Sequence, residues 1–115
     1  MDSITYGKKC EIIACNFLKK KGYEVLQTNY KNKIGEIDII CRDKEYIVFV
    51  EVKGRHSRLF GDPLEAVNLQ KQFKIRQVAT GYLLKEKKMN SSVRFDVISV
   101  LGDEDYEIRH IINAF

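Results

Sequence analysis

Two short segments of the chain combine carboxylates with a lysine in otherwise apolar surroundings. The first reads Gly-Glu-Ile-Asp and carries Glu36 and Asp38, and the second reads Val-Glu-Val-Lys and carries Glu51 and Lys53. Successive residues of a strand point to opposite faces, so each pair lies on one face of its strand. If the segments form a hairpin with a loop of even length, all four side chains share a face. Three carboxylates and one ammonium group are costly to desolvate, which indicates a functional site.

The register of this hairpin decides how close the carboxylates are. If Arg42 pairs with Glu45, Asp38 lies opposite Phe49, and with a loop two residues longer it lies opposite Glu51. In either register the side-chain bases of Asp38 and Glu51 are roughly 5–8 Å apart. A shared proton, a nearby cation or a divalent metal would relieve their repulsion. Carboxylate oxygens favour Mg²⁺ or Mn²⁺ as that metal.

Spacing alone leaves two interpretations of the cluster open. In the first, a metal held by the carboxylates acts as a Lewis acid on a phosphodiester and lowers the pKa of a water molecule. Lys53 would then orient that water or offset charge in the transition state. In the second, Glu51 and Lys53 form an ordinary ion pair on a sheet surface, and Glu36 and Asp38 are solvated.

The elements that would position these residues begin with a helix over residues 3–21. Apolar side chains recur there at helical spacing. Ser3 is expected to cap the start, and Gly22 to end the helix. Glu11 falls at the edge of the apolar stripe, where it can reach solvent or lean over the interior of the domain. Spacing alone favours solvent.

Five segments have the composition of strands: residues 23–30, 34–42, 45–53, 92–101 and 106–112. Asp43 and Lys44 form a tight polar link, so the second and third strands should pair as a hairpin. The third strand is apolar on both faces, which is typical of a central strand covered on both sides.

A second helix is expected from Asp62 to about Lys87. Asp62, Pro63 and Glu65 match a capping box with proline at the first helical position. The resulting order is helix, three strands, helix, and one or two strands. A meander followed by a helical crossover predicts an α/β fold with a mixed sheet flanked by helices.

Length and composition set further limits. The 115 residues suit a single domain over residues 1–115, and the net charge of +4 permits an acidic partner without requiring one. Cys10, Cys15 and Cys41 lack metal-type spacing and are predicted to be free thiols. There is no signal-like start and no apolar stretch approaching the ~20 residues of a membrane span. A cytoplasmic protein without membrane contact is expected.

The runs GEIDII, VFVEVKGR, AVNLQKQFKI and VRFDVISV together resemble the YraN family of small bacterial proteins. These proteins are similar to PD-(D/E)XK nucleases and to archaeal Holliday junction resolvases. The resemblance covers nearly the whole chain, including Gly7, Glu11 and Asn29. It implies a restriction-endonuclease-like core with the element order αβββαβ(β), as predicted above.

The resemblance also implies roles for individual residues. Asp38 matches the superfamily aspartate, Glu51 and Lys53 match the E-x-K motif, and Glu11 matches a first-helix glutamate that can complete the metal site. Glu36 and Gln70 would then contact the proposed ligands without binding the metal themselves. Cys10 and Gly54 depart from the family pattern, in which glycine and a larger residue are usual, but neither departure removes a proposed ligand.

Basic residues around the carboxylate strands could contact phosphates. The predicted nucleic-acid contacts are Lys33, Arg55, His56, Arg58 and Lys71, with Lys31, Lys74 and Arg76 nearby. As histidines, His56 and His110 are otherwise expected to be plain surface residues.

The resemblance therefore implies a Mg²⁺- or Mn²⁺-dependent nuclease acting on DNA, with branched or structured DNA as the substrate class. A chain of this size covers little of a DNA junction, so a homodimer is plausible. One alternative is a nucleic-acid-binding accessory protein with the same fold and no cleavage activity. Another is an interaction protein whose cluster is only a salt-bridge network.

Overall fold

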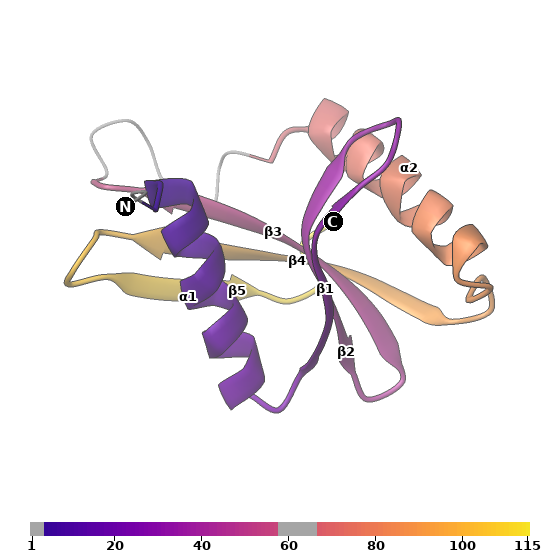
Figure 1. The fold of residues 1–115 in the computed structure, drawn as a ribbon, viewed down its shortest axis with the longest axis horizontal. Helices are drawn as coiled ribbons and strands as arrows, with labels where there is room; N and C mark the ends of the chain where they lie inside the picture. Colours follow the sequence, from indigo (N-terminus) through magenta and orange to yellow (C-terminus); the bar gives the residue numbers. More distant parts are fainter. Residues whose placement is uncertain (1–3, 58–66) are drawn as a thin grey trace.

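A mixed sheet of five strands, in the order β1-β2-β3-β4-β5, forms the centre of the molecule (Figure 1). The computed structural model describes residues 4–57 and 67–115. The elements are α1 (Tyr6–Lys20), β1 (Glu24–Lys31), β2 (Glu36–Asp43), β3 (Tyr46–Arg55), α2 (Leu69–Lys85), β4 (Ser92–Leu101) and β5 (Glu107–Ile111). Neighbouring strands are antiparallel except β3 and β4, which are parallel and joined through α2. The predicted element order and mixed sheet are confirmed.

The two helices cover opposite faces of this sheet. Along β3, Val48 and Val50 pack in the cluster that contains the buried residues of α1. Ile47 and Phe49 pack in the cluster that contains the buried residues of α2. The prediction that β3 is a central strand covered on both faces is therefore confirmed. Within the described residues, neither helix is long and apolar enough to cross a membrane.

Helix α1 starts and ends through its own capping residues. The Thr5 hydroxyl accepts a hydrogen bond from the backbone N–H of Lys8, so Thr5 is the N-cap. The predicted cap, Ser3, lies outside the described residues, and the helix begins later than expected. Gly22 ends α1 with φ +93°, and the N–H of Tyr23 reaches back to the carbonyl of Leu18. The predicted glycine termination is confirmed.

Helix α2 begins later than its sequence pattern indicates. Asn68 is the N-cap, and its side chain accepts a 2.8 Å hydrogen bond from the backbone N–H of Lys71. Residues 67 and 68 are not helical, so a continuous helix from Asp62 is wrong. The capping box of Asp62, Pro63 and Glu65 lies outside the described residues. Asn68 thus places Lys71 in the first turn of α2, next to the end of β3.

The hairpin of β2 and β3 has the register in which Asp38 faces Glu51, reached by shifting a two-residue turn rather than by lengthening the loop. Asp43 pairs with Tyr46, so the turn is Lys44-Glu45 and not Asp43-Lys44. Lys44 adopts a left-handed backbone conformation with φ +55°. Regular pairing extends to Ile39, which pairs with Val50.

One further step in this register brings Asp38 opposite Glu51. The alternation of side chains is interrupted at the same point. Ile37 packs in the α2-side cluster, whereas Ile39 packs in the α1-side cluster. The local irregularity of β2 is centred on Asp38, the residue that the sequence singled out.

Candidate functional site

Asp38 sits where the pairing of β2 with β3 gives way to a side-chain contact. Its Oδ2 accepts a 2.8 Å hydrogen bond from the backbone N–H of Val52. Burial raises the pKa of this carboxyl to about 7, and the negative charge of Glu51 adds to the rise. The Val52 N–H acts in the opposite direction without cancelling the shift. Asp38 is thus a carboxyl group whose surroundings lack enough positive charge.

Glu51 is the most deeply placed of the predicted acidic residues, with its side chain only 7% exposed. Its Oε1 lies 3.6 Å from Nζ of Lys53 on the same strand. The same oxygen lies 3.1 Å from Nζ of Lys71, which α2 brings over the sheet. Glu51 therefore forms ion pairs with two lysines, one from its own strand and one from α2.

The two lysines respond differently to this environment. Burial lowers the pKa of Lys53, and the charge of Lys71 lowers it further, against the attraction of Glu51. Burial acts the same way on Lys71, but its contacts with Glu51 outweigh burial and raise its pKa. Lys71 consequently stays protonated over a wider pH range, and Lys53 loses its proton more readily.

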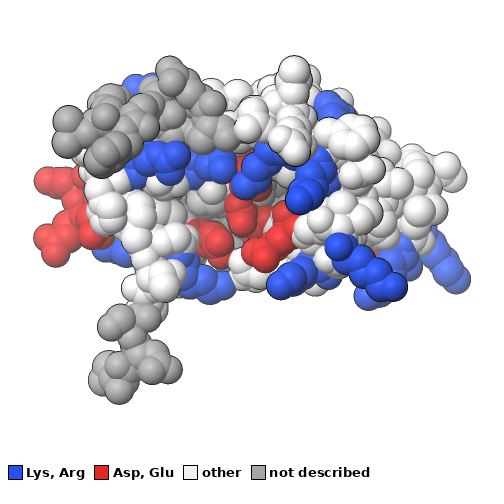
Figure 2. All heavy atoms as spheres, turned by 90° about the horizontal axis from the view of Figure 1, so that it is seen from above, with Lys and Arg blue, Asp and Glu red and all other residues white. Residues whose placement is uncertain are grey.

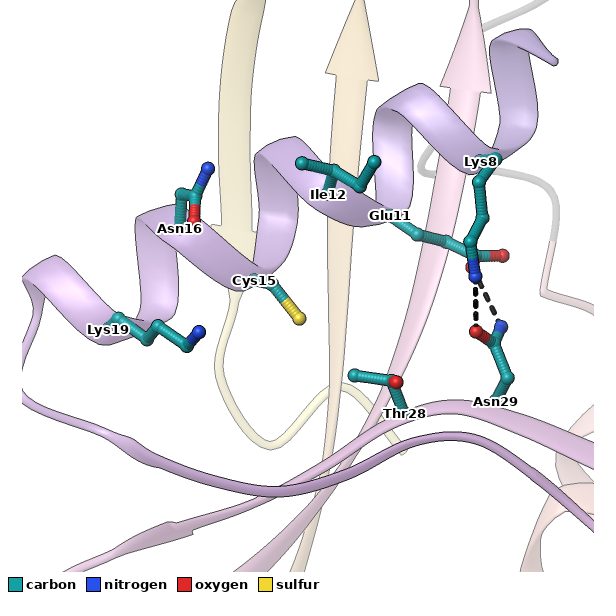
Figure 3. Close-up of a pocket in the computed structure, with 8 residues that line it drawn as sticks. All are labelled: Lys8, Glu11, Ile12, Cys15, Asn16, Lys19, Thr28 and Asn29. Carbon is teal, nitrogen blue, oxygen red and sulfur yellow. Dashed lines mark hydrogen bonds and ion pairs between the residues drawn. The ribbon is translucent and has the colours of Figure 1, made fainter. Parts of the chain in front are cut away.

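Glu11 is directed from α1 toward β1 (Figure 3). Its Oε1 accepts a 2.7 Å hydrogen bond from Nδ2 of Asn29 and lies 3.6 Å from Nζ of Lys8. The side chain is 23% exposed, and its charge contributes to the raised pKa of Asp38. Spacing left open whether Glu11 points to solvent or toward the interior of the domain. In the structure it points inward, toward Asn29 of β1.

The three proposed metal ligands, Glu11, Asp38 and Glu51, lie near one another but are not arranged as a complete metal site. Over residues 4–57 and 67–115, no three His, Cys, Asp or Glu side chains are grouped as a ready-made metal site. Asp38 and Glu51 are coupled by charge, while Asn29 and Lys8 hold the carboxylate of Glu11. The donor chemistry still suits a hard divalent cation, because the site supplies carboxylate oxygens and the charges of the described residues leave the pKa of Asp38 raised.

Comparison with known proteins places the chain in a family. The model of "Uncharacterised protein family UPF0102" matches residues 10–100. The chain belongs to this family. A UPF0102 protein of Clostridioides difficile is 48% identical over 115 residues, covering 100% of both chains. One of Alkaliphilus metalliredigens is 44% identical over 113 residues, covering 98% of this chain and 99% of the relative. The resemblance to YraN is confirmed at this level, and the similarity to nucleases stays a prediction.

Cys10 of α1 and Gly54 of β3 lie against each other in this UPF0102 chain. A Cβ atom added at Gly54 would lie 2.5 Å from Sγ of Cys10 and 3.0 Å from a ring carbon of Tyr6. The sulfur of Cys10 therefore fills the space that a larger residue at position 54 would need.

The remaining predicted residues lie around the site at different depths. Glu36 and Lys33 are exposed, so neither is buried against the carboxylates. Gln70 lines a hollow of about 310 Å³ together with Lys71 and Lys74 at the start of α2. In the view of Figure 2, acidic side chains gather in the middle of the face, with lysines and arginines on both sides of them.

The basic segment after Lys53 is only partly described. Arg55 donates from its guanidinium to the carbonyl of Gly54 at 3.0 Å. The ring of His56 stacks on Tyr6 with 3.8 Å between centroids. The Tyr6 hydroxyl lies 2.8 Å from the carbonyl oxygen of Arg55, which ties the end of β3 to α1. Arg58 lies outside the described residues.

A buried ionic network elsewhere in the sheet was not anticipated. Asp96 is fully buried and accepts hydrogen bonds from Arg94, from His110 and from the backbone N–H of Asn113. Arg94 also binds Asp43 at 2.9 Å. His110 is therefore not a surface residue, because its side chain is 3% exposed. Arg94 and Asp96, two apart in an apolar strand, were the sequence signal for this network.

Proposed function

We propose that this chain is a metal-dependent nuclease that hydrolyses phosphodiester bonds in DNA. The observation that carries the proposal is the carboxyl group of Asp38, half-buried beside Glu51 with its pKa raised to about 7. A sheet that held these groups only for stability would be expected to neutralise them. His110 and Arg94 do so for Asp96 in the same molecule, where their hydrogen bonds lower the pKa of Asp96.

Asp38 and Glu51, with Glu11 beside them, are the residues that would hold Mg²⁺ or Mn²⁺. When bound there, such an ion would polarise a phosphodiester and lower the pKa of a water molecule. The divalent charge would also lower the pKa of Asp38, so ion binding and deprotonation of that carboxyl are coupled.

The chain's own residues have distinct tasks in this proposal. Lys53 lies 3.6 Å from Glu51, and its lowered pKa makes it a lysine that can hold or release a proton beside an attacking water. Lys71, at the start of α2, keeps its positive charge beside Glu51 and would balance the negative charge of a bound phosphate. Lys33, Lys74 and other exposed lysines would bring the polyanion to an acidic centre that would otherwise repel it.

The decisive experiment is a cleavage assay with branched DNA, the substrate class that the family resemblance implies, in the presence of Mg²⁺ or Mn²⁺. Cleavage should occur with the intact chain and be lost in Glu51→Gln and Lys53→Met. Lys44→Met is the matched control, because Lys44 lies at the opposite end of β3 in the hairpin turn. Binding of DNA without cleavage under all metal conditions would refute the nuclease and favour the accessory binding protein.

A further inference from the structure

An open-sided hollow of about 290 Å³ lies between α1 and β1, next to the candidate site (Figure 3). Cys15 of α1 and Thr28 of β1 face each other across it. Both side chains are small, so the helix and the edge strand do not fill the space between them. Glu11 lines one end of the hollow, and its charge reaches Asp38.

The two ends of the hollow are each marked by a lysine of α1. Lys8 and Lys19 lie on the same stripe of the helix as Cys15. At a rise of 1.5 Å per residue, their Cα atoms are about 16 Å apart along the helix axis. The exposed Lys19 side chain runs toward Cys15, and within residues 4–57 and 67–115 its ammonium group makes no ion pair. A compact anion could not reach both lysines, whereas an extended polyanion could.

Asn29 fixes the end of the hollow nearest the carboxylates. Its backbone is left-handed, with φ +50°, a conformation that asparagine tolerates better than most residues. Its amide accepts a 2.5 Å hydrogen bond from Lys8 and donates a 2.7 Å hydrogen bond to Glu11. The conformation of one residue thus connects the lysine-lined hollow to a proposed metal ligand.

We propose that this α1–β1 groove binds the phosphodiester backbone of one unpaired DNA strand that leads to the carboxylates. The proposal rests on the proposed function and adds a strand path to it. None of the residues that the structure places around the groove is aromatic, so bases would not stack there. The volume suits one strand rather than a duplex. The ammonium groups at its ends, with hydroxyl and amide groups between them, provide contacts typical of phosphate and sugar.

The first test measures binding of a single-stranded oligothymidylate of about 12 nucleotides by fluorescence anisotropy, in EDTA so that nothing is cleaved. Lys19→Gln should bind it several-fold more weakly and lower the salt slope by about 0.7, the value for one lost contact to a single strand. Lys20→Gln is the matched control, because the adjacent lysine does not line the groove. Equal slopes in the two variants would overturn the proposal.

The second test uses Cys15 as a probe of groove occupancy. Cys10 and Cys41 are at most 1% exposed, so Cys15, which is half-buried, should be the cysteine that an alkylating reagent modifies first. The oligonucleotide should slow this modification, and Thr28→Phe, which fills the groove, should weaken oligonucleotide binding.

Two outcomes of these tests would refute the groove. One is an oligonucleotide that binds without protecting Cys15, and the other is no binding at all. Protection of Cys15 in a chain that cleaves no branched DNA with metal would support the groove and refute the nuclease. The two proposals can therefore fail separately.

Discussion

At the scale of single residues, Asp38 differs from an ordinary aspartate because burial and the charge of Glu51 both oppose its ionisation. The folded chain therefore retains a proton that the unfolded chain releases. Since the pKa of Asp38 rises from 3.8 to about 7, the stability gained from its neutral form is complete below about pH 3.8. That contribution is lost as the pH rises through about 7.

Asp38→Asn should therefore remove a penalty that grows with pH. Asparagine is neutral and keeps an oxygen for the N–H of Val52. In EDTA at pH 5, the variant should be only slightly more stable than the intact chain, because most of the penalty develops between pH 5 and 7. At pH 8.5 the variant should be more stable by about 1–3 kcal/mol. Chemical denaturation at both pH values measures this, with Asp105→Asn as the exposed control. A difference that does not change with pH would contradict the assignment.

Nζ of Lys71 lies 3.1 Å from Oε1 of Glu51. Lys71 should therefore compete with a divalent cation for this carboxylate. Lys71→Met should bind Mn²⁺ about two- to fivefold more tightly, because a partly exposed ion pair contributes at most about 1 kcal/mol. Titration calorimetry measures the affinity. Lys74→Met, which alters the same hollow, provides the comparison. Weaker Mn²⁺ binding in Lys71→Met would show that Lys71 supports the site rather than competing for it.

At the scale of elements, the site depends on how closely α1 approaches β3. Gly54→Ala should cost about 1–3 kcal/mol, because its Cβ would lie 2.5 Å from Sγ of Cys10. In a Cys10→Ala background the same change should cost at least about 1 kcal/mol less. Gly7→Ala in α1 is the control, since nothing lies within 4 Å of a Cβ there. Strict additivity of the two substitutions in chemical denaturation would refute this packing account.

How far the sequence predicts these elements depends on the range of the interaction involved. Strand alternation is local, so the common face of Asp38 and Glu51 could be predicted. The register depends on the left-handed conformation of Lys44, and two turns were compatible with the sequence. Asp62 and Asn68 are both suitable N-caps, and composition does not distinguish them. The contact of Lys71 with Glu51 joins α2 to β3, and no local pattern encodes its distance.

At the scale of the whole molecule, the described residues include two acidic centres with opposite electrostatic character, one at Asp38 and Glu51 and the other at Asp96. Asp38 is left with too little positive charge, and its pKa is raised. Burial also opposes ionisation of Asp96, but hydrogen bonds from His110, Arg94 and the Asn113 N–H outweigh it, and its pKa is lowered. Through Arg94 the second centre joins β4 to Asp43 at the end of β2. We interpret Asp96 as part of the scaffold and Asp38 as part of the site.

Substitution of the two aspartates should therefore change stability in opposite directions. Asp96→Asn removes one of the two carboxylates that pair with Arg94, leaves only Asp43 as its ionic partner, and should cost up to about 3–5 kcal/mol. Because the pKa of Asp96 is depressed, its contribution is present above about pH 3.8 and is lost only as the pH falls through its lower folded value. Asp96→Asn should thus be destabilised at both pH 5 and pH 8.5, whereas Asp38→Asn should be more stable than the intact chain by a margin that grows from pH 5 to pH 8.5. Chemical denaturation of the metal-free proteins tests both signs, and destabilisation of Asp38→Asn at pH 8.5 would place Asp38 with Asp96 in the scaffold.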